Sequence, residues 1–315
     1  MTGTARPAPR APARRGWIGA IQAAATVVVG LLVWRALARH WDDFRSVELE
    51  VTLRPGWVAL AAAAVFVTYA LQIQSWRYLL DGWRQSLSYG RAARIWLVVN
   101  LGRYVPGKIW SVAGLIVLAQ EAGVAPWAAA ASTVAVQALG VGTAVGVVAA
   151  VTPGAASPAR LAAALLAALG LIVILGSAKA ARWIGRMAGT QQQLQPLPLA
   201  AAARAAALTL AAWLVYGLAF WLLARGLGLP GAFPLPLAVG VFALGYVLGL
   251  LALLAPGGVG VRELAFVGLL TPSLGGGGAI ALSVASRLLL TATEVAAPLV
   301  TLWLTRGRKE ALRGR

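Results

Sequence analysis

The chain has 315 residues, of which 60% are hydrophobic and only 11% are charged, and its mean hydropathy is +0.80. A soluble domain is usually about one quarter charged, so this composition excludes a soluble globular protein and makes lipid the solvent of the fold. The net charge of +18 does not indicate nucleic acid, because the basic residues lie in short segments between apolar runs, where they set membrane topology.

Residue types that usually carry catalysis or metals are scarce. Cysteine is absent and His40 is the single histidine, which excludes disulfides and thiolate metal sites and disfavours a histidine metal site or a serine–histidine pair. We therefore expect no catalytic residues, no metal and no cofactor, and we do not expect an enzyme.

Apolar runs follow one another along the chain. Residues 1–16 form a basic, Pro- and Ala-rich segment that we expect to be a disordered cytoplasmic tail, and residues 306–315 form a second basic tail. Residues 17–305 between them are predicted to be one transmembrane domain. The first apolar run covers residues 17–38 and is long enough to span a bilayer. Five further runs are also long enough: 57–80, 126–151, 160–178, 204–224 and 279–305.

The first run, 17–38, has an alternative interpretation as a cleaved signal peptide, which its length and Arg35 disfavour. Two more apolar regions, 93–119 and 235–270, each contain a Pro-Gly break. The glycine run 275–278 is predicted to be an external turn.

Charge distribution decides how the chain crosses the membrane. If both broken regions enter and leave on one side, nearly every basic cluster falls inside, and the segment 40–53, with four of the nine acids, falls outside. We therefore predict an all-α bundle of about six spanning helices plus two re-entrant hairpins. Both termini are expected in the cytoplasm, and the protein in the inner (plasma) membrane.

The two breaks lie 150 residues apart, which divides the chain into halves of about 17–151 and 159–305. At the same offset Leu139 matches Leu289 and Thr143 matches Thr293. Halves with three crossings each must be inverted relative to one another. Inverted repeats with interrupted segments in matching places are typical of transporters and of their binding sites.

The first break follows a cationic turn, in the order Arg103, Tyr104, Val105, Pro106, Gly107 and Lys108. Proline removes a backbone donor and glycine relaxes the turn, so the freed backbone groups must face protein or a wet cavity. Two cations at a helix N-terminus indicate an anion site suited to phosphate. The alternative is that Arg103 and Lys108 reach the membrane surface instead.

The second break is rich in glycine, in the order Pro256, Gly257, Gly258, Val259, Gly260, Val261, Arg262 and Glu263. Adjacent residues on a helix do not face each other, so we expect Arg262 and Glu263 to reach different partners. Glu263 also suits the helix dipole, whereas a cation at a positive helix end needs an anion.

Arg287 lies inside the last apolar run, where a charge normally faces the bundle interior. Glu263 and Glu294 are its candidate partners, in a structural ion pair or in a functional site. Gln137 occupies the equivalent position in the first half and is predicted to line the same cavity.

Residues 103–110 with Gly123-Val124, and residues 256–263, resemble the transmembrane domain of lysylphosphatidylglycerol synthase/flippase proteins. Arg287 sits where that family tends to have an arginine, and the resemblance covers about residues 17–305. It implies lipid translocation without aminoacyl transfer, since a separate cytosolic domain performs that transfer. Some stand-alone members are linked to polyprenol-sugar metabolism.

These observations favour a flippase-like transporter of an anionic or phosphate-bearing lipid, of phospholipid or polyprenyl-phosphate type. Its headgroup would contact Arg103, Tyr104 and Lys108 on one hairpin, and Arg262, Glu263, Arg287 and Gln137 on the other side. The alternative is a non-transporting partner that binds a lipid-linked sugar for a glycosyltransferase. Membrane lipids, a glycosyltransferase or a second copy of the chain are the expected partners.

Overall fold

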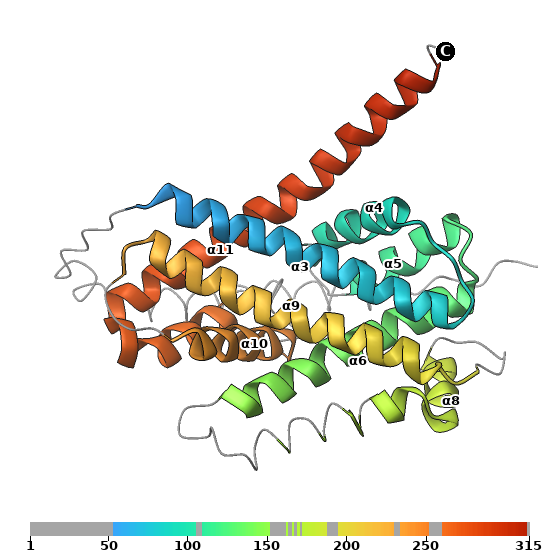
Figure 1. Ribbon diagram of the computed structural model, residues 1–315, viewed down its shortest axis with the longest axis horizontal. Helices are drawn as coiled ribbons and strands as arrows, with labels where there is room; N and C mark the ends of the chain where they lie inside the picture. The colour runs from blue at the N-terminus through green and yellow to red at the C-terminus, as the bar shows by residue number, and fades with distance from the viewer. Residues whose placement is uncertain are drawn as a thin grey trace, which may run out of the picture.

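The computed structural model describes residues 53–104, 109–151, 172–187, 195–229, 234–251 and 260–313, with isolated positions between 162 and 170. Every regular element in these ranges is helical (Figure 1). The elements are α3 (Pro55–Gly82), α4 (Tyr89–Asn100), the 3-10 turn η1 (Leu101–Tyr104), α5 (Ile109–Glu121), α6 (Pro126–Val151), α8 (Ala178–Met187), α9 (Leu199–Gly226), α10 (Leu235–Leu251) and α11 (Val261–Arg313).

Four of these helices are long and apolar enough to cross a membrane: α3, α6, α9 and residues 261–301 of α11. Each of α3 and α9 has 28 residues, which is about 42 Å of helix against a hydrocarbon core of about 30 Å. The predicted polytopic helical bundle is confirmed. The crossing predicted at 17–38 and part of the one at 160–178 lie outside the described residues.

The two 28-residue helices pack side by side in opposite directions (Figure 1). At one end the backbone N–H of Arg54, just before α3, donates to the carbonyl of Gly226 over 2.8 Å. At the other end, Gly82 lies so close to the start of α9 that a Cβ there would be 2.7 Å from Leu197 Cδ1 and 2.9 Å from Ala201 Cβ. Glycine is therefore required for the close approach of these helices.

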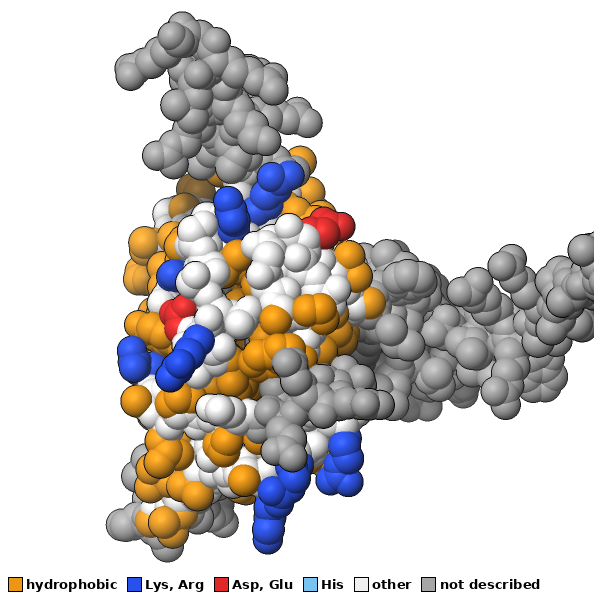
Figure 2. Space-filling view, turned by 90° about the vertical axis from the view of Figure 1, so that its right-hand side faces the viewer, with side chains coloured by type: hydrophobic (Ala, Val, Ile, Leu, Met, Phe, Trp, Pro, Cys, Tyr) orange, Lys and Arg blue, Asp and Glu red, His pale blue; other side chains and the backbone are white. Residues whose placement is uncertain are grey.

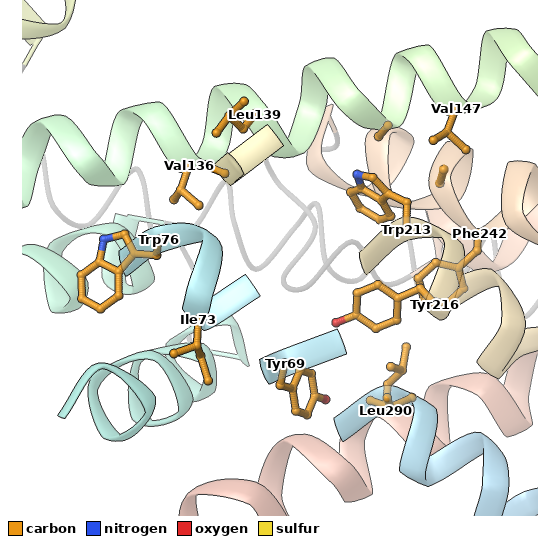
Figure 3. Packing of buried hydrophobic residues seen from close by; sticks show 14 of the residues in the cluster. Tyr69, Ile73, Trp76, Val136, Leu139, Val147, Trp213, Tyr216, Phe242 and Leu290 are labelled. Carbon is orange, nitrogen blue, oxygen red and sulfur yellow. The ribbon is translucent and has the colours of Figure 1, made fainter. Parts of the chain in front are cut away.

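Aromatic and aliphatic side chains from five helices meet in the bundle interior (Figure 3). Trp76, Phe220 and Phe266 are the largest fully buried side chains among the described residues. Side-chain hydrogen bonds also join the helices: Tyr69 Oη to Thr293 Oγ1 over 3.0 Å, Trp213 Nε1 to Thr143 Oγ1 over 3.0 Å, and Trp76 Nε1 to Ser132 Oγ over 3.0 Å. Hydrogen bonds of this kind stabilise contacts between membrane helices, because in lipid hydrophobic burial does not favour helix–helix contacts over helix–lipid contacts.

The connections after α3 and α5, the segment before α9 and helix α8 lie at one end of the bundle (Figure 1). There the Trp83 indole donates to the Gln195 carbonyl over 3.1 Å, and the Ala125 N–H donates to Gln85 Oε1 over 2.9 Å. Figure 2 looks toward this end and shows Lys and Arg side chains scattered over it. The connections after α3, after α5 and before α9 therefore lie on the same side of the bundle.

Within the glycine run 275–278, Gly275 has non-helical geometry, with φ 70° and ψ 167°, and it separates two helical parts of α11. The chain reverses direction between these parts, because Glu263 before Gly275 and Arg287 after it lie 3.7 Å apart. Gly277 and Gly278 are buried, so packing in the interior holds these flexible residues in the helix. Helical backbone also continues to Arg313, into the segment expected to be a tail.

Helix α8 was not anticipated. Among its described side chains, Lys179, Arg182, Trp183 and Arg186 are exposed, and Ala180, Ala181 and Gly185 are buried. The helix packs on α6.

Candidate functional site

A cavity of about 190 Å³ lies among α4, α5, α6, α10 and α11. Its apolar wall includes Val99, Leu115 and Val136, and its glycines are Gly245 and Gly249. The polar residues that line it are Trp96, Asn100, Ser111, Thr133, Gln137, Tyr246 and Arg262. The cavity is thus built by the two broken regions and by one spanning helix, α6.

The residues on both sides of each break border this one cavity. Asn100 and Ser111 lie before and after the first break, and Leu250 and Arg262 lie before and after the second. Two segments of opposite halves, far apart in sequence, therefore converge on a single site. A break that frees backbone groups at membrane depth must border such a polar space, since lipid cannot satisfy them.

Arg262 opens α11, and its guanidinium lies over two neighbouring aromatic rings. Its guanidinium carbon lies 4.6 Å from the ring centre of Phe242 and 4.9 Å from that of Phe266, which is cation–π geometry. Phe266 is in turn fixed by close contact with Gly245, where a Cβ would collide with the ring. The aromatic contacts position the guanidinium without neutralising its charge.

Buried hydrogen-bond donors without partners are concentrated at the cavity. Among the described residues, four buried side-chain polar atoms have no hydrogen-bond partner: Trp96 Nε1, Ser111 Oγ, Arg262 Nη2 and Ser283 Oγ. Three of these four belong to residues that line the cavity. An indole N–H and a guanidinium only donate, and a hydroxyl can donate, so three residues of this wall each carry a donor that no acceptor satisfies.

Glu263 reaches partners different from those of Arg262, as the sequence predicted. Its Oε2 accepts a hydrogen bond of 2.6 Å from the backbone N–H of Gly260, which caps the start of α11. Its Oε1 lies 3.7 Å from Nη1 of Arg287. Gly260 has φ +88°, a conformation that favours glycine, so this residue shapes the entry to the helix.

An ion pair joins the two helical parts of α11. The ion pair of Arg287 with Glu263 is mostly enclosed, with 26% and 18% of the two side chains exposed. Arg287 therefore faces the bundle interior and one of its two candidate partners.

The structure brings together part of the predicted site. Gln137 and Arg262 line the same cavity, and Gln137 is exposed. Arg103 and Tyr104 belong to η1, which precedes the first break, and nothing further is described of their side chains. Pro106, Gly107, Lys108, Pro256, Gly257 and Gly258 lie outside the described residues.

Sequence reasoning did not single out Trp96, Ser111 or Tyr246. Tryptophan was interpreted as part of an interfacial belt, but Trp96 lies within α4 and not at its end. The repeat offset could have identified it, since Trp96 and Tyr246 are 150 residues apart. No group of three or more His, Cys, Asp or Glu residues within the described ranges is placed to hold a metal ion.

One comparison with known proteins identifies the family of the chain. The family described as "Lysylphosphatidylglycerol synthase TM region" matches residues 21–297. The search of curated proteins found no match for this chain. The match spans both broken regions, the cavity between them and the ion pair of α11. The chain therefore belongs to the lysylphosphatidylglycerol synthase transmembrane-region family.

Proposed function

We propose that the protein is a flippase-like transporter that moves an anionic or phosphate-bearing lipid, of phospholipid or polyprenyl-phosphate type, between the leaflets of the membrane. One observation carries the proposal: residues that flank both Pro-Gly breaks line one cavity, and Arg262 lies in its wall. A cation at a helix N-terminus, on a wall that both halves share, suits an anionic headgroup near the middle of the membrane.

An inverted repeat underlies this proposal, and the cavity itself supports it. Eight of the lining residues form pairs that are 150 residues apart: Trp96 with Tyr246, Val99 with Gly249, Asn100 with Leu250, and Val112 with Arg262. Corresponding faces of the two halves therefore border the same space. A pseudo-two-fold axis through the cavity would produce this arrangement.

Hydrogen bonds in the interior support the same symmetry. Tyr69 of α3 bonds Thr293 of α11, and Trp213 of α9 bonds Thr143 of α6, each over 3.0 Å. The two aromatic residues are 144 residues apart and the two threonines 150. Each bond joins one half to the other, and each is the counterpart of the other, as in a two-fold contact between identical partners.

The mechanism follows from this arrangement. The headgroup binds beside Arg262 from the second half, and Arg103 and Lys108 of the first half are the further cations that the sequence predicts to contact it. Arg287 is paired with Glu263, with 3.7 Å between Nη1 and Oε1, and it can contact the headgroup once this ion pair opens. Glycines beside the breaks let each hairpin change conformation, so that the site opens to one leaflet and then to the other.

The same proposal includes an orientation. The basic connections that gather at one end of the bundle lie in the cytoplasm, both termini are cytoplasmic, and the membrane is the inner (plasma) membrane. The positive-inside rule supports this orientation, since Arg84, Lys179 and Arg182 all lie in or near these connections.

A flipping assay in proteoliposomes tests the proposal. Arg262→Ala and Lys108→Ala should each reduce the flipping rate of a fluorescent phosphatidylglycerol at least tenfold, by removing a cation from the headgroup site. Arg225→Ala is the matched control, because this guanidinium also stacks on an aromatic ring, Trp221 at 4.8 Å, but does not line the cavity.

Unchanged rates in both cavity variants, with folding intact, would overturn the mechanism. A wild-type protein that does not flip lipid but co-purifies with a glycosyltransferase would establish the second function, that of a partner which presents a lipid-linked sugar.

A further inference from the structure

The hydrogen-bond donors at the cavity indicate more about its ligand than the positive charge of Arg262 does. Trp96 on α4 and Ser111 on α5 belong to the first half, whereas Arg262 belongs to the second. Each contributes a buried atom without a hydrogen-bond partner among the described residues. A buried donor without an acceptor is unfavourable, so three of them at one small cavity indicate a ligand that supplies acceptors.

The nature of the ligand follows from these donors. An amine or other cation would add donors and would be repelled by Arg262. A single carbonyl or hydroxyl supplies one oxygen, which is too few for donors on three different helices. A phosphate group carries several acceptor oxygens that point in different directions, and its charge strengthens each bond.

The size of the cavity agrees with this ligand. An apolar cavity of about 150 Å³ admits a benzene molecule, so about 190 Å³ admits a phosphate group but not an entire lipid. The apolar side of the wall, with Val99, Leu115 and Val136, suits the first carbons on either side of the phosphate.

We propose that Trp96, Ser111 and Arg262 together bind one phosphate group, through an indole N–H, a hydroxyl and a guanidinium. The inference rests on the proposed function, since the phosphate is that of the transported lipid. The protein thus selects its lipid by the phosphate and not by the amine or sugar attached to it. Trp96 and Ser111 are binding residues, and two of the three donors are uncharged.

Binding measured on the full-length protein in detergent tests the inference. The probes are dihexanoyl phosphatidylglycerol, inorganic phosphate and dihexanoylglycerol, which lacks the phosphate. Ser111→Ala and Trp96→Phe should each weaken binding of the phospholipid about tenfold, and Arg262→Gln about a hundredfold, which are the effects of losing a hydrogen bond to a charged group. Dihexanoylglycerol should show no saturable binding.

Two matched controls are available in the chain. Ser283→Ala also removes a buried hydroxyl without a partner among the described residues, but Ser283 does not line the cavity. Trp183→Phe removes an indole N–H from a side chain that is 50% exposed. Both should bind within twofold of the wild type. Ser111→Ala deletes one oxygen and should fold normally, so the test does not depend on Trp96→Phe.

The possible outcomes distinguish free phosphate from lipid-linked phosphate as the ligand, and they test the phosphate site separately from the transport function. Competition by inorganic phosphate supports recognition of the phosphate alone, and binding of the lipid only, lost in the same variants, supports a phosphate that must be lipid-linked. Wild-type affinity in Ser111→Ala and Trp96→Phe, or equal binding of dihexanoylglycerol, overturns the inference. If the variants lose binding but the wild type does not flip lipid, the transport function fails and the phosphate site stands. If flipping is intact and binding is unchanged in both variants, the phosphate site fails and transport stands.

Discussion

Glu263 and Arg287 face each other across the kink of α11, with Oε1 of the carboxylate 3.7 Å from Nη1 of the guanidinium. The same carboxylate accepts the N–H of Gly260 over 2.6 Å. One side chain therefore ties the end of the second break to the last spanning helix, and it does so with both oxygens.

Glu263→Ala should lower the stability of the fold by about 2–3 kcal/mol, because it removes the cap and leaves a partly buried arginine without this counter-charge. Glu263→Gln keeps an oxygen for Gly260 and should lose about half as much. The thermal midpoint in detergent measures both. Glu121→Gln, at an exposed acid that ends α5, is the control. A wild-type midpoint for Glu263→Ala would show that neither contact contributes.

Gly82→Ala and Gly226→Ala should each destabilise the pair formed by α3 and α9. A Cβ at Gly226 would lie 2.7 Å from Val58 Cγ2 and 3.2 Å from Val58 N, as crowded as the one at Gly82. Overpacking of this kind costs about 1–3 kcal/mol, which appears as a lower thermal midpoint.

The control for these two variants is Gly268→Ala, since a Cβ at that helical position meets nothing within 4 Å. It should leave the midpoint unchanged or raise it slightly, by up to about 1 kcal/mol of stability. Equal effects at all three glycines would mean that helix propensity, and not the close approach, governs these positions.

Single cysteines test the orientation, because the chain has no native cysteine. Ser86→Cys and Gln195→Cys lie at the exposed positions of the basic end, and Arg54→Cys and Pro234→Cys are exposed in the connections at the other end. In intact cells a membrane-impermeant maleimide should label positions 54 and 234 and leave 86 and 195 unlabelled until the membrane is opened. Labelling of 86 and 54 from the same side would contradict the topology.

Helix α8 should lie in the membrane interface. Its exposed residues combine Lys179, Arg182 and Arg186 with Trp183, a composition typical of interfacial helices. A fluorescent label that reports polarity, attached to Trp183→Cys, should emit at shorter wavelength in vesicles of anionic lipid than the same label at Ser86→Cys. Identical emission at the two positions would place α8 in water.

Much of the architecture could be predicted from the sequence. Composition predicted the membrane bundle, and the four described crossings match apolar runs. The repeat offset predicted that Gln137 would line the same cavity as Arg287, and the cavity is lined by Gln137 and Arg262 but not by Arg287. The predictions of the bundle and its crossings succeed because hydropathy and backbone breaks are local signals with strong constraints in lipid.

Other features depend on tertiary contacts that the sequence does not display. The missing partners of Trp96 and Ser111 arise from how α4 and α5 pack, and nothing local in the sequence distinguishes them from interfacial or helix-lining residues. The burial of Gly277 and Gly278 likewise depends on how α11 packs in the bundle.

Gly275 divides α11 into a short arm that carries Arg262 and the last spanning helix. In the first half, Gly123 lies between α5 and α6, and both glycines have a positive φ, +93° at Gly123 and +70° at Gly275. Glu263 and Arg287 lie on either side of Gly275 and 3.7 Å apart, so the short arm folds back onto the last helix. A force or a bound partner at the C-terminal end of α11 (Figure 1) would therefore reach Arg262 through this ion pair, and not along one continuous helix.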